Sequence, residues 1–291
     1  MSMAQKEAIK VSCRFAVVSD THFDMPPESD AYFEVRAINK IGEDRGGLDA
    51  VIMAGDMCDK ADPKIINLFR QRYDKGKGDK TIHYDTYPTF GNHDIAPVNG
   101  RPLKDRSGNE CNIQYMDSVL KMYQRDGKIL NIHPSSRSYS FNLGGVHFID
   151  SQLSAGETSY CEDNFIWLES DLKKYASDGT PVVYIQHYGV DEWALDWWPE
   201  KNRERLLKLL GQYQLAGFFV GHTHTASMQY FRGFPVMQVN NGWKDHDGSP
   251  SFVVVTIKGK EVTIENCLFN GPDGNYRVAQ PTMHMRIPVN H

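Results

Sequence analysis

The sequence predicts an α/β fold because short apolar, β-branched runs alternate with ranges of helical periodicity. The first part of the chain shows this order: we expect a strand at 14–18, a helix at about 31–41, a strand at 50–54 and a helix at 63–73. Pro63 lies in the first turn of that second helix, where a missing backbone N–H costs nothing. This order of strands and helices is typical of a sheet covered by helices.

The remaining elements are expected in the order strand, strand, helix, strand, helix and then four strands. Their predicted ranges are 139–143, 146–150, 164–176, 182–185, 199–211, 227–231, 236–239, 252–257 and 262–268. Gly144-Gly145 between the first two of these strands predicts a tight hairpin. The last strand is expected to pair with the strand before it.

Length and composition agree with one large α/β domain. The chain has 291 residues, of which 40% are hydrophobic and 24% charged, and this is enough for a well-buried core. We expect a single domain over 1–291, with its core at about 13–269 and a C-terminal extension at 270–291. The extension, rich in Pro and Gly, carries no inferred chemistry.

Charge and apolar patterning bear on partners and location. The formal net charge is −5 and no dense Lys/Arg block is present, so binding to duplex nucleic acid is not expected. There is no apolar stretch of 18 residues, and residues 1–10 lack an apolar signal core. The five cysteines are scattered without a Cys-x-x-Cys pair, which suits a reducing compartment. We therefore expect a cytoplasmic protein, although a signal peptide removed before this start remains an open alternative.

Polar, metal-ligating side chains gather where predicted strands end. The five segments concerned are 19–22, 55–56, 91–94, 186–187 and 221–224. Two divalent ions roughly 3.5–4 Å apart need about seven or eight nitrogen and oxygen ligands, one of them bridging. The candidate ligands number seven: Asp20, His22, Asp56, Asn92, His187, His222 and His224. Glycines 55, 91 and 221 beside them suit a close backbone approach to an ion or an anionic substrate.

Each segment also has a purely structural interpretation. Asp20-Thr21-His22 alone is equally well explained as a turn or helix cap, and Gly55-Asp56 alone is most often a plain turn. His222-Thr223-His224 is the strongest single signal, because His-x-His after a strand is a common metal pattern. The five segments together, each at a strand end, favour a metal centre.

This ordered set, Asp-x-His, Gly-Asp, Gly-Asn-His-Asp, His and Gly-His-x-His, resembles the calcineurin-like metallophosphoesterases over roughly residues 13–257. The resemblance implies a four-layer αββα sandwich of two mixed β-sheets flanked by helices, with a two-metal site at the rim. It implies that one metal is held by Asp20, His22, Asp56 and His224. It implies that the second is held by the bridging Asp56, with Asn92, His187 and His222.

Within the same resemblance, His93 faces the substrate as a catalytic residue and Asp94 orients its ring. The implied reaction is attack on phosphorus by a hydroxide that bridges the two metals. The cofactors are then two divalent or trivalent ions, and the nitrogen and oxygen donor set accepts manganese, iron or zinc.

Motif details separate the branches of the family. The protein Ser/Thr phosphatases carry Gly-Asn-His-Glu, whereas this chain ends that motif with Asp94, and the purple acid phosphatases carry a Tyr where this chain has Asp59. The motifs at 19–22, 55–59, 91–94 and 149–152 are most similar to the class III cyclic nucleotide phosphodiesterase type. Tyr188-Gly189 after His187 departs from that type.

We therefore expect hydrolysis of a small phosphodiester, cyclic nucleotide-like or related, by a metal-dependent phosphoesterase. The alternatives are a phosphomonoesterase acting on a small, lipid or nucleotide phosphate and, more remotely, a non-catalytic scaffold on the same fold.

Aromatic and basic residues near these motifs are candidates for the pocket wall. Trp193, Trp197 and Trp198 either stack on an apolar leaving group or cover a gap between a helix and the sheet. Trp243 is a further pocket candidate. The segment from about 95 to 112 is either a substrate-covering loop with a phosphate-binding cation or a solvated surface loop. The cations in question are Arg101, Lys104 and Arg106.

Overall fold

Two mixed β-sheets, flanked by helices, form the computed structural model, which describes residues 11–23, 28–95, 110–244 and 248–288. The first sheet has the order β13-β12-β11-β1-β2-β3, with β14 pairing β12. Its strands are β1 (Ser12–Val18), β2 (Ala50–Met53), β3 (Thr86–Tyr87), β11 (Ser251–Lys258), β12 (Glu261–Asn270), β13 (Asn275–Val278) and β14 (Met283–Arg286). In this sheet β1, β2 and β3 run parallel, and β11 is antiparallel to β1.

The second sheet has the order β4-β5-β6-β7-β8-β10-β9. Its strands are β4 (Asn131–Ile132), β5 (Tyr139–Leu143), β6 (Val146–Asp150), β7 (Val182–Ile185), β8 (Leu215–Val220), β9 (Ser227–Phe231) and β10 (Phe234–Gln238). Strands β6, β7, β8 and β10 are parallel neighbours. Gly144 and Gly145, both with positive φ, form the turn between β5 and β6, as the sequence predicts.

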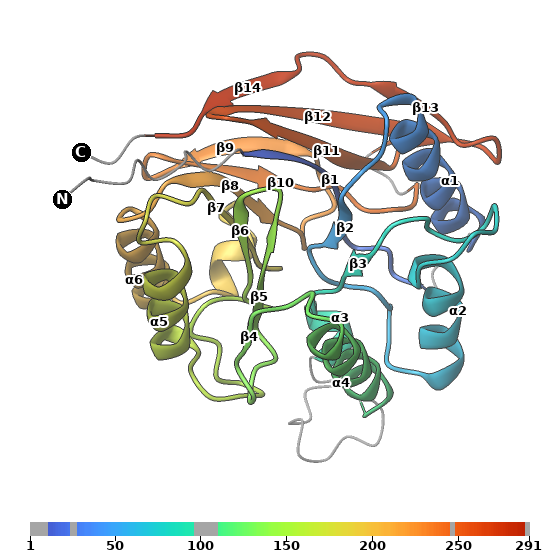
Figure 1. The fold of residues 1–291 in the computed structure, drawn as a ribbon. Coiled ribbons are helices and arrows are strands. Elements are labelled where there is room, and N and C mark those ends of the chain that lie inside the picture. Colours follow the sequence, from blue (N-terminus) through green and yellow to red (C-terminus); the bar gives the residue numbers. More distant parts are fainter. Residues whose placement is uncertain (1–10, 24–27, 96–109, 245–247, 289–291) are drawn as a thin grey trace.

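Helices flank the two sheets, with α5 and α6 together on one side and α1 and α2 on the other (Figure 1). The described helices are α1 (Glu28–Asp44), α2 (Pro63–Tyr73), α3 (Asn92–Ile95), α4 (Glu110–Arg125), α5 (Phe165–Tyr175), the 3-10 turn η3 (Ala194–Asp196) and α6 (Glu200–Leu210). Local sequence explains their ends: the carboxylate of Asp62 accepts the N–H of Lys64 at 2.7 Å and caps α2.

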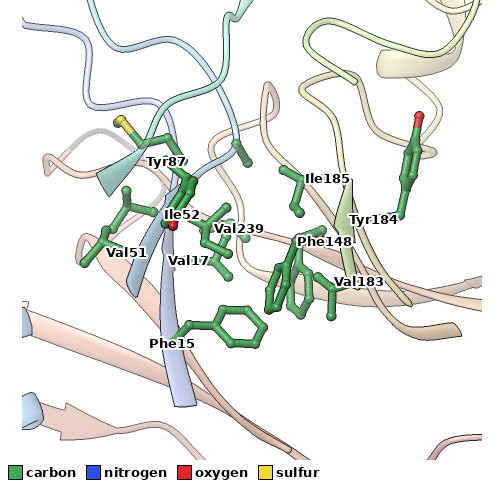
Figure 2. Close-up of a cluster of buried hydrophobic side chains, with 14 of the residues drawn as sticks. Phe15, Val17, Val51, Ile52, Tyr87, Phe148, Val183, Tyr184, Ile185 and Val239 are labelled. Atoms are coloured by element: carbon green, nitrogen blue, oxygen red, sulfur yellow. The ribbon is translucent and has the colours of Figure 1, made fainter. Parts of the chain in front are cut away.

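Aromatic side chains fill the space between the sheets. The ring of Phe15 from β1 meets the rings of Phe148 and Phe219 edge-on, at centroid distances of 5.0 and 6.0 Å. Figure 2 shows Phe15 and Phe148 in this cluster, while the ring of Tyr184 points away from it. Edge-to-face packing of this kind stabilises the contact between the two sheets. The strand ends that carry the candidate ligands are therefore rooted in a buried core.

The structure confirms the predicted fold class and the pairing of the strand at 262–268 with the strand before it. It also contains elements that the sequence analysis did not predict. Helix α4 and strand β4 lie in the region after residue 109, and the tail forms β13 and β14, which pair with β12. Both tail strands are short, with a weak alternation of apolar residues, so periodicity alone does not reveal them.

Two further observations concern the cysteines and the helices. All five cysteines are free. Among the described residues, no helix is both long and apolar enough to cross a bilayer.

Candidate metal centre

Five loops that follow strands β1, β2, β3, β7 and β8 meet at one place on the molecule. Because parallel neighbours end at the same edge of a sheet, side chains distant in sequence can converge there. The isolated bridge between Ser19 and Asn241 brings loops of the two sheets together, and the pairing of β7 with β8 places the loops of His187 and His222 side by side. All seven candidate ligands lie in these loops or at the start of α3.

The first group of ligand atoms comes from Asp20, His22 and His224. Nε2 of His22 lies 3.1 Å from Nε2 of His224, and Oδ1 of Asp20 lies 3.7 and 3.4 Å from these two nitrogens. All three ligand atoms are within 4.8 Å of one another. Two nitrogens and one oxygen thus point at a common position.

The second group comes from Asp56, His187 and His222, whose ligand atoms also lie within 4.8 Å of one another. Oδ1 of Asn92 joins it, 3.0 Å from Nε2 of His187. Nδ1 of His187 is 2.8 Å from the carbonyl oxygen of Ala54, which directs Nε2 towards the group.

Asp56 lies between the two groups. Its Oδ2 atom is 3.4 Å from Nε2 of His22 and 3.3 Å from Nε2 of His187, while Oδ1 accepts the backbone N–H of His93 at 2.8 Å. One carboxylate oxygen is therefore shared by both groups, as a bridging ligand must be.

The donor set fits a pair of metal ions. Oδ1 of Asp20 and Nε2 of His222 are buried and have no hydrogen-bond partner among the described residues. Leaving such atoms without a partner is costly unless a ligand completes them. The mixture of imidazole nitrogen with carboxylate and amide oxygen suits manganese, iron or zinc.

Backbone strain is concentrated in the same loops. Five of the seven candidate ligands have a positive φ, between 40° and 81°. They are Asp20, His22, Asp56, His222 and His224. Such a conformation costs a non-glycine residue roughly 1–3 kcal/mol, so it persists only where the surrounding structure imposes it. The sequence carries no signal for this strain.

Three glycines let these loops approach closely. A Cβ at Gly55 would lie 2.3 Å from Nδ1 of His187, and one at Gly91 would lie 2.0 Å from Oδ1 of Asp56. At Gly221 it would lie 2.7 Å from Oδ2 of Asp20. The sequence predicts a close backbone approach to an ion or an anionic substrate, whereas in the structure these glycines lie against the side chains of candidate ligands.

The carboxylates set the electrostatics of the centre. Burial disfavours a charged ring at His22, but the nearby carboxylates of Asp20 and Asp59 outweigh it and raise the pKa of His22 to about 10. Burial is likewise outweighed at His187, where the charge of Asp56 raises the pKa to about 9. The centre thus strongly favours positive charge at these positions.

His222 behaves in the opposite way. Burial and the neighbouring His187 lower the pKa of His222 to about 3. Its ring is therefore neutral at physiological pH, and the neutral ring is the form that ligates a metal.

His93 lies at the open side of the centre, with 41% of its side chain exposed. Its Nδ1 atom is 2.9 Å from the carbonyl oxygen of Asp59 and 3.5 Å from the Asp59 carboxylate. The family resemblance implies that Asp94 orients this ring, and here the structure differs. The ring neighbour is Asp59.

Asp94 has another place in the fold. Its two carboxylate oxygens accept the backbone N–H groups of Met57, Cys58 and Gly91 at 2.8–3.1 Å. Asp94 is buried and ties the loop after β2 to the loop after β3. The sequence does not show whether Asp59 or Asp94 lies against the ring of His93, so only the fold distinguishes the two acids.

The tryptophans predicted to line the pocket separate into two kinds. Trp193 stacks on His222 with ring centroids 4.5 Å apart, and Trp197 lies 5.6 Å from the same ring. Trp198 is fully buried, so it belongs to the core. Trp243 lies 5.9 Å from His224 on the other side of the centre. Arg101, Lys104 and Arg106 lie outside the described residues.

A family model described as calcineurin-like phosphoesterase matches residues 13–226. The chain therefore belongs to the calcineurin-like phosphoesterase family of metal-dependent hydrolases, and the two groups of ligand atoms described above form its candidate metal centre. Among curated proteins, purple acid phosphatase 13 of Arabidopsis thaliana is 37% identical over 95 residues. That match covers 29% of this chain and only 16% of the relative.

Solved structures with low sequence identity share the fold. A dimetal phosphatase from Danio rerio has a TM-score of 0.63 and 12% identity, covering 96% of this chain and 100% of that one. GAP50 of Plasmodium, described as the anchor in the inner membrane complex, has a TM-score of 0.60 and 15% identity, covering 96% and 90%. These likenesses establish the architecture around the metal centre.

Proposed function

We propose that this member of the calcineurin-like phosphoesterase family hydrolyses a small phosphodiester, and that it is of the class III cyclic nucleotide phosphodiesterase type. The observation that carries the proposal is the position of Asp56. Its Oδ2 atom is within 3.4 Å of imidazole nitrogens from both groups of ligands. A shared carboxylate is what a two-metal phosphoesterase requires.

The residues present would hold the ions in the way the sequence analysis expects. Asp20, His22 and His224 would hold one ion, and His187, His222 and Asn92 the other, with Asp56 between them. When bound, such ions neutralise phosphoryl oxygens and lower the pKa of water towards about 7. Manganese, iron and zinc all match the donors.

His93 is the protein group placed to act on the substrate. Its Nδ1 atom is occupied by the carbonyl oxygen of Asp59, which leaves Nε2 as the nitrogen available to the substrate. In the protonated ring, Nε2–H can donate to a phosphoryl oxygen or to the leaving oxygen. His93 therefore acts as a proton donor at the open side of the centre.

The proposal is tested by metal analysis and turnover on one purified sample. Mass spectrometry counts the metals per chain, and hydrolysis of bis(p-nitrophenyl) phosphate is compared with that of p-nitrophenyl phosphate. Two metals per chain and faster cleavage of the diester are expected. Faster cleavage of the monoester would replace the diesterase with a phosphatase. Absence of both metal and activity after addition of manganese would favour a scaffold.

A phosphomonoesterase is the second candidate, favoured by the local match to a purple acid phosphatase. Two features support the diesterase instead. Position 59 is Asp, whereas the purple acid phosphatases carry a Tyr there. In addition, the exposed indoles of Trp193 and Trp197 beside His222 provide a surface for a second ester group, which a monoester does not have.

A further inference from the structure

The loop at residues 191–199, here named the tryptophan loop, presents aromatic surface to solvent beside the metal centre. The side chains of Trp193 and Trp197 are 55% and 48% exposed. Both rings nevertheless lie against His222, at 4.5 and 5.6 Å. Large apolar side chains are usually buried, so two exposed indoles next to a candidate metal ligand indicate a binding surface.

The first part of the tryptophan loop is fixed in place. Oδ1 of Asp191 accepts the backbone N–H groups of Trp193 and Ala194, each at 3.1 Å. Oδ2 of Asp191 accepts the hydroxyl of Thr223 at 3.0 Å. Because Thr223 lies between His222 and His224, the loop is tied directly to the loop that carries two metal ligands.

The end of the tryptophan loop is fixed by the core. The indole of Trp198 is fully buried, and its N–H donates to the carbonyl oxygen of Ala155 at 3.2 Å. The guanidinium of Arg203 donates to the carbonyl oxygen of Leu195 at 2.8 Å and to that of Trp198. The exposed indoles are therefore held in position before any ligand arrives, which lowers the entropic cost of binding.

One indole face is available to a ligand. The ring of Trp193 stacks on His222 with an angle of 10° between the planes. With one face covered in this way and 55% of the side chain exposed, the opposite face is open to solvent. Trp197 lies nearly perpendicular to His222, at 74°. The two indoles together form a corner next to the second group of ligands.

The segment that carries the two indoles is acidic. Residues 191–200 contain four acidic residues and neither Lys nor Arg. Glu200 pairs with Arg203 and Arg232. Glu192 and Asp196 are exposed and make no ion pair with another described residue. An anionic group would be repelled by this corner, whereas a cationic group would be attracted.

We propose that the tryptophan loop binds an organic ammonium group on one ester arm of the substrate, so that the substrate is a diester of the choline or ethanolamine kind. This inference rests on the proposed phosphodiesterase function. The face of an indole attracts a cation through its quadrupole, and aromatic cages bind quaternary ammonium groups in this way. Glu192 and Asp196 add a long-range attraction that salt would weaken.

The test uses two chromogenic diesters that differ in one atom. One is p-nitrophenyl phosphocholine, and the other is its 3,3-dimethylbutyl analogue, in which carbon replaces the ammonium nitrogen. Both release p-nitrophenolate, so the ratio of their kcat/KM values reports recognition of the charge alone. We expect the choline ester to be favoured roughly tenfold, or about 1.4 kcal/mol, which lies between an exposed and a desolvated cation–π contact.

Variants locate the effect. Trp193→Leu and Trp197→Leu should bring the ratio towards one, whereas Trp193→Phe should keep part of it because the aromatic face remains. Glu192→Gln with Asp196→Asn should lower the ratio most at low salt. Tyr230→Leu removes another exposed aromatic side chain, 75% exposed on β9, and should leave the ratio unchanged.

A binding measurement separates this inference from the proposed function. Tetramethylammonium is titrated into the metal-loaded protein, and tryptophan fluorescence is followed. A saturable change that Trp193→Leu removes supports the ammonium site. Diester hydrolysis without a preference for the choline ester, and without this change, overturns the inference but leaves the phosphodiesterase intact. Ammonium binding without hydrolysis of either diester, or of cyclic AMP, keeps the site and overturns the phosphodiesterase.

Discussion

The backbone carbonyl oxygen of Asp59 lies 2.9 Å from Nδ1 of His93, and the carboxylate of Asp59 lies 3.3 Å from Nδ1 of His22. Asp59 thus contacts Nδ1 of His22, a candidate metal ligand, and Nδ1 of His93, the candidate proton donor. In each histidine the other ring nitrogen, Nε2, is left available to the centre. Outer contacts of this kind fix the orientation and the tautomer of a ring.

Asp59→Asn should lower kcat by about 10- to 100-fold, the usual cost of losing a carboxylate behind a functional histidine. The backbone contact to His93 remains, so the loss reports the carboxylate. Steady-state kinetics with bis(p-nitrophenyl) phosphate measures it. Asp79→Asn is the matched control, because the side chain of Asp79 is 86% exposed. Equal effects of the two substitutions would remove Asp59 from the site.

His93→Ala should keep both metals and lose turnover. The ring of His93 is half exposed, and its Nδ1 atom is directed at Asp59 rather than at the ligand groups. Removing one positioned proton donor typically costs about 10²–10⁴-fold in rate. Metal content by mass spectrometry and kcat are measured on the same sample. An active His93→Ala enzyme would exclude this residue from the mechanism.

Asp56→Asn should abolish binding of the metal pair. The Oδ2 atom of Asp56 serves both groups of ligands, while Oδ1 accepts the N–H of His93. The amide that replaces the carboxylate has no negative charge and only one oxygen, which cannot do both. We expect fewer than two metals per chain and no thermal stabilisation by added manganese, since stabilisation requires binding to the folded state. Asn92→Ala should likewise prevent binding of the pair. Full metal content in Asp56→Asn would contradict the bridging role.

Glu34→Gln should change how stability depends on pH. Glu34 is fully buried beside Gly242 and accepts the hydroxyl of Tyr73. Burial raises its pKa to about 8, against an ordinary value of 4.5, although the bond from Tyr73 acts the other way. The folded protein therefore holds a proton that the unfolded chain releases between these two values, and stability falls as pH rises through them.

The amide of Glu34→Gln does not titrate, so the variant should gain stability relative to the natural chain between pH 5 and pH 9. A pKa displacement is worth about 1.4 kcal/mol per unit, which makes the expected change several kcal/mol. Urea unfolding followed by circular dichroism at pH 5, 7 and 9 measures it. Glu43→Gln, an exposed acid on the same helix α1, should not alter the pH dependence. Parallel stability curves for Glu34→Gln and the natural chain would contradict the prediction.

The ligand positions were predictable because they depend on local pattern. An apolar run followed by a polar side chain marks a strand end, and parallel strands bring such ends to one edge. Asp20 and His222 could therefore be placed near each other from the sequence. The bridging position of Asp56 is implied by the family resemblance but not by periodicity, and the distances from its Oδ2 atom to histidines of both sheets support it.

Other features of the site depend on tertiary geometry. Trp193 and Trp198 lie five residues apart in one loop, yet one is exposed on His222 and the other is buried. Composition cannot separate them, because the 3-10 turn between them sets which way each ring points. In the same way, Asp59 and Asp94 carry the same side chain near His93, and only the fold shows which one faces its ring.

Gly55→Ala tests the close approach of the loops, and Gly47→Ala is its control. Both glycines have a positive φ, +100° and +111°, so the methyl group strains the backbone similarly at each. At Gly55 the new Cβ would lie 2.3 Å from Nδ1 of His187, whereas at Gly47 nothing lies within 4 Å. Only the first substitution must displace a candidate ligand.

We therefore expect both variants to lose about 1–2 kcal/mol of stability from the strained backbone. Only Gly55→Ala should also lose metal, since His187 cannot keep both its contact with the carbonyl oxygen of Ala54 and its place beside Asp56. Metal content and the affinity for manganese, measured by titration calorimetry, separate the two effects. If Gly55→Ala bound metal as tightly as Gly47→Ala, the position of the His187 ring would not limit assembly of the centre, and the clash would be relieved by movement of the loop after β2.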